Sequence, residues 1–268
     1  MLTAGLGAVA VAVARVPVAV VAGAFGLVIG SFLNVVVYRA PRRLSVVRPG
    51  SFCPACRTPI RPADNVPLVS WLVLRGRCRV CGAPISPRYP AVEASTAGVF
   101  GVLAWGLGPH WAVPGMCVLA ATLLALAVIE LDGLPAPPRE TMVGSAAGIV
   151  LLAVAAVADR RWWHLGGALL GATAGAALVV GLAAAARRGK RTTVPWAALP
   201  GGTVVGWVGV TGVAVGIPVA VVAFGVAALY RARRSKVGGD ISGVALAAVL
   251  GCTAALVAAL VAGQPVGR

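Results

Sequence analysis

Long apolar segments separated by short polar ones recur along the whole chain. A helix needs about 20 apolar residues to cross a bilayer. The apolar runs predict eight such helices, at residues 17–38, 91–108, 112–131, 141–158, 165–187, 202–216, 217–230 and 241–262. We therefore expect an all-α membrane protein with about eight transmembrane helices. The sixth and seventh runs are short and meet near Gly216 and Pro218, so a single kinked helix, and seven spans in total, is the alternative.

A long polar segment interrupts the apolar pattern between the first and second predicted helices. It divides the chain into a first transmembrane segment (1–38), a loop domain (39–90) and a helical membrane domain (91–268). Residues 1–14 are apolar but lack a basic start, so we interpret them as the outer end of the first helix or a short lead-in to it, rather than a cleavable signal.

Composition and charge agree with a membrane protein and indicate its orientation. Of the 268 residues, 59% are hydrophobic and 11% are charged, whereas soluble domains carry about 25% charged residues. The net charge of +16 is concentrated in the loops 39–90, 187–191 and 231–236. With eight helices these loops share one side, which the positive-inside rule places in the cytoplasm, whereas seven helices would separate 231–236 from the others. The basic charge therefore indicates topology, and no nucleic-acid binding is expected.

The loop domain contains two CxxC pairs separated by 21 residues. Two such pairs can wrap one metal ion in a tetrahedral thiolate site, which is typical of structural zinc. The predicted ligands are Cys53, Cys56, Cys78 and Cys81. Two disulfides are the alternative, which a reducing cytoplasm disfavours. Cys117 and Cys252 lie within predicted helices, where we expect them to be small packing residues.

The residues around these cysteines resemble the prepilin peptidases. The segment Gly30-Ser-Phe-Leu-Asn-Val-Val-Val-Tyr-Arg39 is similar to the entry signature of that family, and the segments 65–71 and 85–93 follow in the family's order. The resemblance covers about residues 25–98. It implies a bacterial inner-membrane enzyme that cleaves the basic leader of type IV-like prepilins or pseudopilins at the cytoplasmic face. It also implies N-methylation of the new amino terminus by S-adenosylmethionine.

Cleavage in the prepilin peptidases uses two membrane-embedded aspartates, and this chain departs from both motifs. Alignment on Pro137 places Glu130 at the first aspartate, Asp132 two residues later, and Pro138 where an aspartate usually stands. The second motif, Gly-x-Gly-Asp, places Thr203 at the other aspartate. A threonine hydroxyl is not ionised near neutral pH and cannot perform a carboxylate's acid–base role.

Other acids are candidates for the missing carboxylate or for further roles. Asp240 ends Val-Gly-Gly-Asp before the last predicted helix, where it is either a helix cap or a displaced catalytic acid. The tentative catalytic set is therefore Glu130, Asp132 and Asp240. Glu93 matches the family's Tyr-Pro-x-x-Glu element, which implies a role in methyl transfer, a salt bridge to a loop arginine being the alternative. We expect Asp64 and Asp159 to be solvated loop charges.

Two functions remain open from the sequence. The first is an active prepilin peptidase that can also methylate its product. The second is a proteolytically inactive homologue that acts as a scaffold or partner in pilus or secretion assembly. A transporter is disfavoured because no predicted helix carries a charge at its centre.

Overall fold

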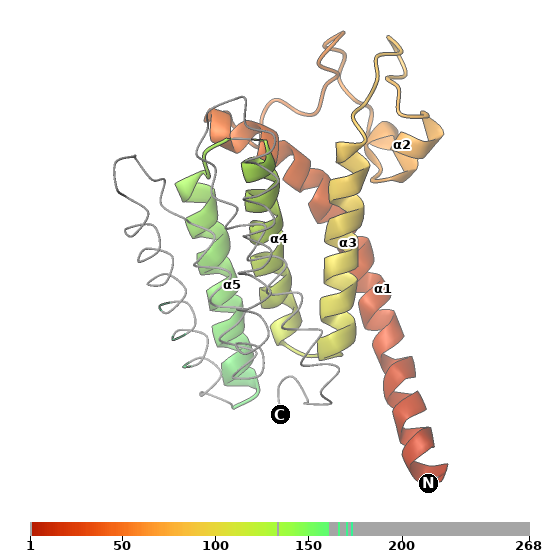
Figure 1. Cartoon of the computed structure of the whole chain (residues 1–268), viewed down its shortest axis with the longest axis vertical. Helices are drawn as coiled ribbons and strands as arrows, with labels where there is room; N and C mark the ends of the chain where they lie inside the picture. The colour runs from red at the N-terminus through yellow and green to blue at the C-terminus, as the bar shows by residue number, and fades with distance from the viewer. Residues whose placement is uncertain (1, 133, 161–165, 167–169, 171–172, 174–268) are drawn as a thin grey trace, which may run out of the picture. The chain divides into compact units, whose positions relative to one another are not determined.

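The computed structural model describes residues 2–132 and 134–160 together with residues 166, 170 and 173; the side chains of residues 2–12 and 130 are outside this description. Every regular element among the described residues is a helix (Figure 1). The elements are α1 (Leu2–Arg39), η1 (Ala40–Arg42), η2 (Pro62–Asn65), α2 (Val69–Val73), α3 (Arg88–Leu107), α4 (Ala112–Leu131) and α5 (Pro138–Ala158). Two isolated β-bridges, and no strands, accompany these helices within that part of the chain. The all-α prediction is confirmed for these residues.

Three helical segments are long and apolar enough to cross a membrane: Val13–Arg42, Ala112–Ile129 and Pro138–Ala158. They correspond to the first, third and fourth predicted helices. The second prediction, 91–108, coincides with the 20-residue α3, but polar residues such as Glu93 and Thr96 make α3 less apolar. The other four predicted helices fall outside the described residues, apart from 166, 170 and 173. The structure therefore bears on four of the eight predictions.

The chain separates into two units, Met1–Val102 and Leu103–Arg268. In the first unit α1 and α3 pack antiparallel and unusually close together (Figure 1). A Cβ atom on Gly26 would lie 2.7 Å from Ala97 Cα, and one on Gly30 would lie 2.7 Å from Glu93 Cα. Glycines four residues apart thus let the two helix backbones touch, as small residues do in membrane helix pairs.

Asn34 continues the α1 contact stripe one further turn along the helix. Its buried amide donates hydrogen bonds to Gly30 O at 3.3 Å and to Tyr89 O at 3.1 Å. The second of these bonds joins α1 to the first turn of α3. An interhelical bond of this kind compensates for the cost of placing an amide among apolar residues. It therefore fixes the register of α1 against α3.

In the second unit α4 and α5 form an antiparallel pair (Figure 1). Gly115 contacts Leu152, and Gly148 contacts Leu119, so each helix provides a glycine against a leucine of the other. At the far end of the pair, His110 Nε2 lies 3.2 Å from Asp159 Oδ2. The expectation that Asp159 is a solvated charge was therefore wrong, because it closes one end of the helix pair.

Candidate metal centre and acidic residues

The first CxxC pair lies in a tight turn closed by backbone hydrogen bonds, which we call the first knuckle (residues 51–60). Arg57 N–H donates to Cys53 O at 2.8 Å, and Cys53 N–H donates to Thr58 O at 3.0 Å. Arg57 adopts a left-handed φ of 58°, which costs a residue with a Cβ roughly 1–2 kcal/mol. An antiparallel bridge between Phe52 and Pro59 closes the base of the turn.

The second CxxC pair repeats this turn bond for bond in the second knuckle (residues 76–85). Gly82 N–H donates to Cys78 O at 2.9 Å, and Cys78 N–H donates to Ala83 O at 2.8 Å. The bridge between Arg77 and Pro84 corresponds to that at the base of the first knuckle. Gly82, with φ of 70°, takes the left-handed position. The two segments share the order Cys-x-x-Cys-x-x-Pro-Ile, and this shared order produces the shared conformation.

The two knuckles bring all four cysteine sulfurs together. Their Sγ atoms lie within 4.8 Å of one another, and Cys53 Sγ is 3.8 Å from Cys81 Sγ. Tetrahedral coordination with Zn–S bonds of about 2.3 Å requires sulfurs about 3.8 Å apart, whereas a disulfide requires about 2.05 Å. All four cysteines are free thiols. Their number, type and spacing therefore fit one tetrahedral metal ion.

The thiols differ in acidity because their hydrogen-bonding partners differ. The Thr58 side chain, followed by its backbone N–H, lowers the pKa of Cys56 from 9.0 to about 6. The backbone N–H groups of Cys81 and Val80 lower the pKa of Cys78. Cys81 also has a stabilising backbone bond, at Ala83, but desolvation and the three neighbouring sulfurs outweigh it and raise its pKa to about 11. Four thiolates at this distance repel one another, and a divalent cation would offset that repulsion.

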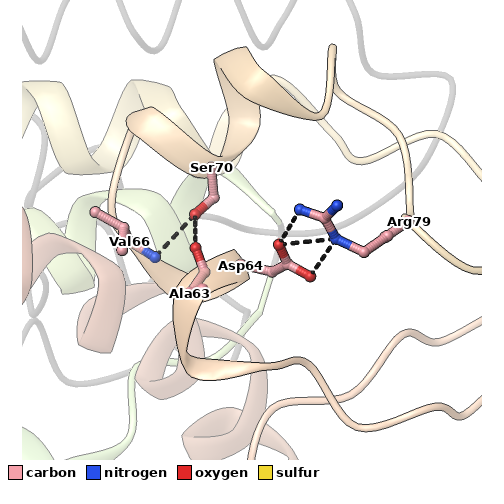
Figure 2. A network of polar contacts seen from close by, with 5 residues as sticks. All are labelled: Ala63, Asp64, Val66, Ser70 and Arg79. Atoms are coloured by element: carbon pink, nitrogen blue, oxygen red, sulfur yellow. Dashed lines mark hydrogen bonds and ion pairs between the residues drawn. The ribbon is translucent and has the colours of Figure 1, made fainter.

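An ion pair outside the cysteines links the second knuckle to η2 (Figure 2). Arg79 Nη2 donates to Asp64 Oδ1 at 2.6 Å, and Arg79 Nε donates to Asp64 Oδ2 at 2.8 Å. The guanidinium lowers the pKa of Asp64. Ser70 closes η2 on the other side, by donating to Ala63 O at 3.1 Å and accepting from Val66 N–H at 2.9 Å. The expectation that Asp64 is a solvated charge was therefore wrong.

Glu93 connects the loop domain to α3. Its side chain is 7% exposed, and its Oε2 accepts a hydrogen bond from Leu68 N–H at 2.8 Å. Leu68 has φ of 59° and ψ of −51°, and Val69 N–H donates to Pro67 O at 2.6 Å across it. These are the features of a γ-turn with positive φ, which is rare and strained. Glu93 therefore helps to hold the loop in a conformation that leucine does not favour.

Of the three candidate catalytic acids, the structure describes Asp132 in full, Glu130 by its backbone alone, and Asp240 not at all. Glu130 lies in the last turn of α4, but its side chain is outside the described residues. Asp132 follows the end of α4, is exposed, and donates its backbone N–H to Val128 O at 3.1 Å. Asp240 and Thr203 are outside the described residues. The structure thus places Glu130 and Asp132 at one end of α4, and their catalytic assignment remains a prediction.

Part of the chain, including the loop domain, matches a known protein family. Residues 24–107 match the bacterial peptidase A24 N-terminal domain. This segment is therefore similar to the N-terminal domain of that peptidase family. The matched range begins within α1 and ends with α3, so it includes both knuckles, η2, α2 and Glu93. The resemblance inferred from the sequence is confirmed.

Three curated relatives of the chain have a common description. The chain is 36% identical over 178 residues to the prepilin leader peptidase/N-methyltransferase of Neisseria gonorrhoeae, covering 58% of this chain and 60% of the relative. Proteins with the same description from Myxococcus xanthus and Aeromonas hydrophila are 46% and 37% identical over 126 and 175 residues, which cover 47% and 56% of this chain. The chain spans 38–60% of the length of these three relatives. No solved structure is significantly similar to it.

Three residues of the matched segment 24–107 have structural roles that the sequence prediction missed. Asn34 bridges α1 and α3, and a lone amide in an apolar helix was the available signal. Thr58 bonds to Cys56, and its position two residues after the cysteine was the signal. Leu68 forms the strained turn held by Glu93. No local pattern marks that turn, since leucine normally avoids positive φ.

Proposed function

We propose that the chain is a prepilin peptidase-like protein of the bacterial cytoplasmic membrane, with its loop domain in the cytoplasm. The observation that carries this proposal is an A24 N-terminal domain with its four cysteines gathered at metal-binding distance. The relatives described as prepilin leader peptidase/N-methyltransferase support type IV-like prepilins or pseudopilins as its substrates. The ten arginines between residues 39 and 90 support the cytoplasmic location of the loop.

The metal that we propose for the four cysteines is Zn²⁺ in a structural role. All four ligands would be protein thiolates, which leaves no open position for a substrate. Cys53 and Cys56 would hold the first knuckle, and Cys78 and Cys81 the second. The metal would therefore join two turns that are otherwise linked to one another by little buried apolar surface.

Peptide cleavage by this chain would depend on its carboxylates. One carboxylate takes a proton from the attacking water, and a protonated one donates to the substrate, so that the amide C–N bond breaks and the leaving amine gains a proton. Glu130 is our candidate for one of these groups, with Asp132 beside it. Asp240 is our candidate for the second, because Thr203 cannot ionise in this way. Methylation would use S-adenosylmethionine, with Glu93 as the candidate residue near the methyl donor.

A second candidate function is a proteolytically inactive homologue that binds prepilins or assembly proteins. Two sequence observations favour it: Thr203 at the second aspartate position and Pro138 in the first motif. Such a protein would keep the A24 N-terminal domain and its metal centre but would not cleave prepilins.

Co-expression with a type IV-like prepilin distinguishes the two functions. We expect leader cleavage, detected as a mass shift of the pilin, to be present with the native chain and lost with Glu130→Ala. Glu140→Ala provides the control, because Glu140 is an exposed acid in the first turn of α5 with no proposed role. Asp240→Ala tests the second carboxylate. Absence of cleavage by the native chain, together with co-purification of intact prepilin, would favour the scaffold.

A further inference from the structure

An apolar surface is exposed on the loop domain at residues 66–73, which we call the α2 hook. Val69, Leu72 and Val73 are 54%, 66% and 69% exposed, and Val66 is 45% exposed. Positions i, i+3 and i+4 lie on one face of a helix, so Val69, Leu72 and Val73 share one side of α2. Three adjacent apolar side chains with this exposure form a patch of the kind that marks an interaction site.

The patch is held in place by contacts on the other sides of the hook. Trp71 Nε1 donates to Ile85 O at 3.1 Å, and the Trp71 ring lies against Gly76, where an added Cβ would be 3.0 Å from the ring. Leu68 is fixed by Glu93, and Ser70 is bonded to Ala63 and Val66. These hydrogen bonds direct Trp71 into the loop domain and hold α2 with its apolar face outward.

The hydrogen bond between Leu68 and Glu93 also determines where the hook lies along the length of α3. Glu93 is the sixth residue of α3, whose 20 residues span about 30 Å, the thickness of the hydrocarbon core. Gly30 of α1 lies against Glu93 at the same level. Phe32 and Val28 of α1, near this level, are 49% and 58% exposed. The hook thus lies beside the first turns of α3, which form the end at which α3 would leave the bilayer, and the knuckle loops extend beyond that end (Figure 1).

The charges next to the hook complement an anionic lipid surface. Arg61, Arg75 and Arg77 are exposed on either side of it in the sequence. Interfacial segments combine an apolar face among acyl chains with cationic side chains at the phosphates. Arginine also extends along apolar surface while its guanidinium stays at the headgroups.

We propose that the α2 hook inserts into the membrane interface and binds anionic phospholipid. Val69, Leu72 and Val73 lie at the boundary between acyl chains and headgroups, and Arg75 and Arg77 contact lipid phosphates. The loop domain is then anchored to the bilayer at three places: the end of α1, the start of α3 and the hook. The four cysteines of the knuckles remain outside the bilayer.

Photo-crosslinking from the full chain tests this proposal. Benzoylphenylalanine is incorporated at Val73 or at Val80, and the protein is reconstituted in nanodiscs that contain phosphatidylglycerol and phosphatidylcholine. Val80 is the matched control, because it is also a valine, 65% exposed, but lies between the cysteines of the second knuckle. We expect lipid adducts, identified by mass, at least fivefold more abundant from position 73 than from position 80.

The other outcomes overturn the proposal. Equal lipid labelling at the two positions would show that the hook has no special access to lipid. Labelling of a second copy or of a co-purified protein from position 73 would assign the surface to a protein partner. If Arg75→Gln with Arg77→Gln does not reduce the ratio of phosphatidylglycerol to phosphatidylcholine adducts from position 73, the preference for anionic lipid is wrong.

Discussion

Arg57 and Gly82 occupy the same position in two matching turns, and both have a left-handed backbone. The space around Gly82 is open, since an added Cβ would meet no atom within 4 Å. A side chain at position 82 would therefore cause no steric clash with neighbouring residues, and its cost would come from the left-handed backbone conformation alone. Glycine enters this conformation without steric cost, whereas arginine does not. The two knuckles thus allow arginine and glycine to be compared in the same backbone conformation within one protein.

Substitution at this position should have a different effect on metal affinity in each knuckle. Metal binding selects the folded turn, so strain of ~1 kcal/mol from Gly82→Ala should weaken affinity about fivefold. Arg57→Gly relieves similar strain but adds freedom to the unfolded chain, so affinity should be unchanged or slightly tighter. Competition with a chromogenic zinc chelator measures both. Unchanged affinity in Gly82→Ala would contradict the proposed strain.

The acidity of the thiols predicts an order of alkylation in metal-free protein. At pH 7 a thiol with a pKa of about 6 is mostly thiolate, and one with a pKa of about 11 is almost fully protonated. The thiolate is the reactive form. Cys56 should therefore react with iodoacetamide before Cys81, although Cys81 is the more exposed residue.

Peptide mass spectrometry after brief alkylation at pH 7 gives this order directly. Thr58→Val removes the hydroxyl that lowers the pKa of Cys56, so its alkylation should slow several-fold. Thr58→Ser keeps the hydroxyl and should react like the native chain. Faster labelling of Cys81 than of Cys56 in the native chain would show that exposure, rather than acidity, sets the rate.

Among the elements, the α1–α3 pair shows what the sequence could and could not predict. The apolar runs indicated both helices because their length and composition are local properties. Gly26, Gly30 and Asn34 recur every four residues, but this spacing does not identify the helix that they contact. The knuckles were predictable because each depends on residues close together in the chain. The turn at Leu68 was not, because a carboxylate 25 residues away stabilises a conformation that the local sequence disfavours.

Adding one methyl group to α1 should destabilise the pair. Gly30→Ala places a Cβ 2.7 Å from Glu93 Cα, a backbone contact that a side-chain rotation cannot relieve. Overpacking of this kind costs about 1–3 kcal/mol. Gly98→Ala in α3 is the matched control, since its Cβ would meet no atom within 4 Å and alanine favours a helix.

Thermal unfolding in detergent, followed by size-exclusion chromatography, compares the two variants. We expect the melting temperature to fall by several degrees in Gly30→Ala and to stay the same or rise in Gly98→Ala. Equal melting temperatures in the two variants would indicate that α1 and α3 separate readily enough to accept the added methyl group.

The molecule as a whole divides into two units that differ in what stabilises them. The first unit relies on a close helix contact and on the loop domain, whereas α4 and α5 of the second unit pack glycine against leucine. Metal is proposed for the first unit alone. The proposed catalytic pair joins the end of α4 with Asp240, which lies outside the described residues.

Loss of the metal should therefore affect one unit and spare the other. Cys78→Ala should abolish stoichiometric zinc, measured by elemental mass spectrometry, and should speed trypsin cleavage between residues 39 and 88. Fragments that contain α4 and α5 should persist. Cys117→Ala, a change of the same type at a buried cysteine of α4, should leave zinc content unchanged. Equal cleavage of the native chain with and without a chelator would contradict a structural metal.

The proposed metal ion would join Cys53 to Cys81, and this link would affect the pairing of α1 and α3. Without it, the ends of the two helices are joined by the whole chain from Arg39 to Arg88. With it, the path shortens to the segments 39–53 and 81–88, and a shorter tether raises the effective concentration of one helix near the other. A metal ion bound outside the bilayer, in the loop domain, would thus favour the pairing of α1 and α3 within the membrane. Zinc supply during synthesis would then influence how quickly α1 and α3 pair.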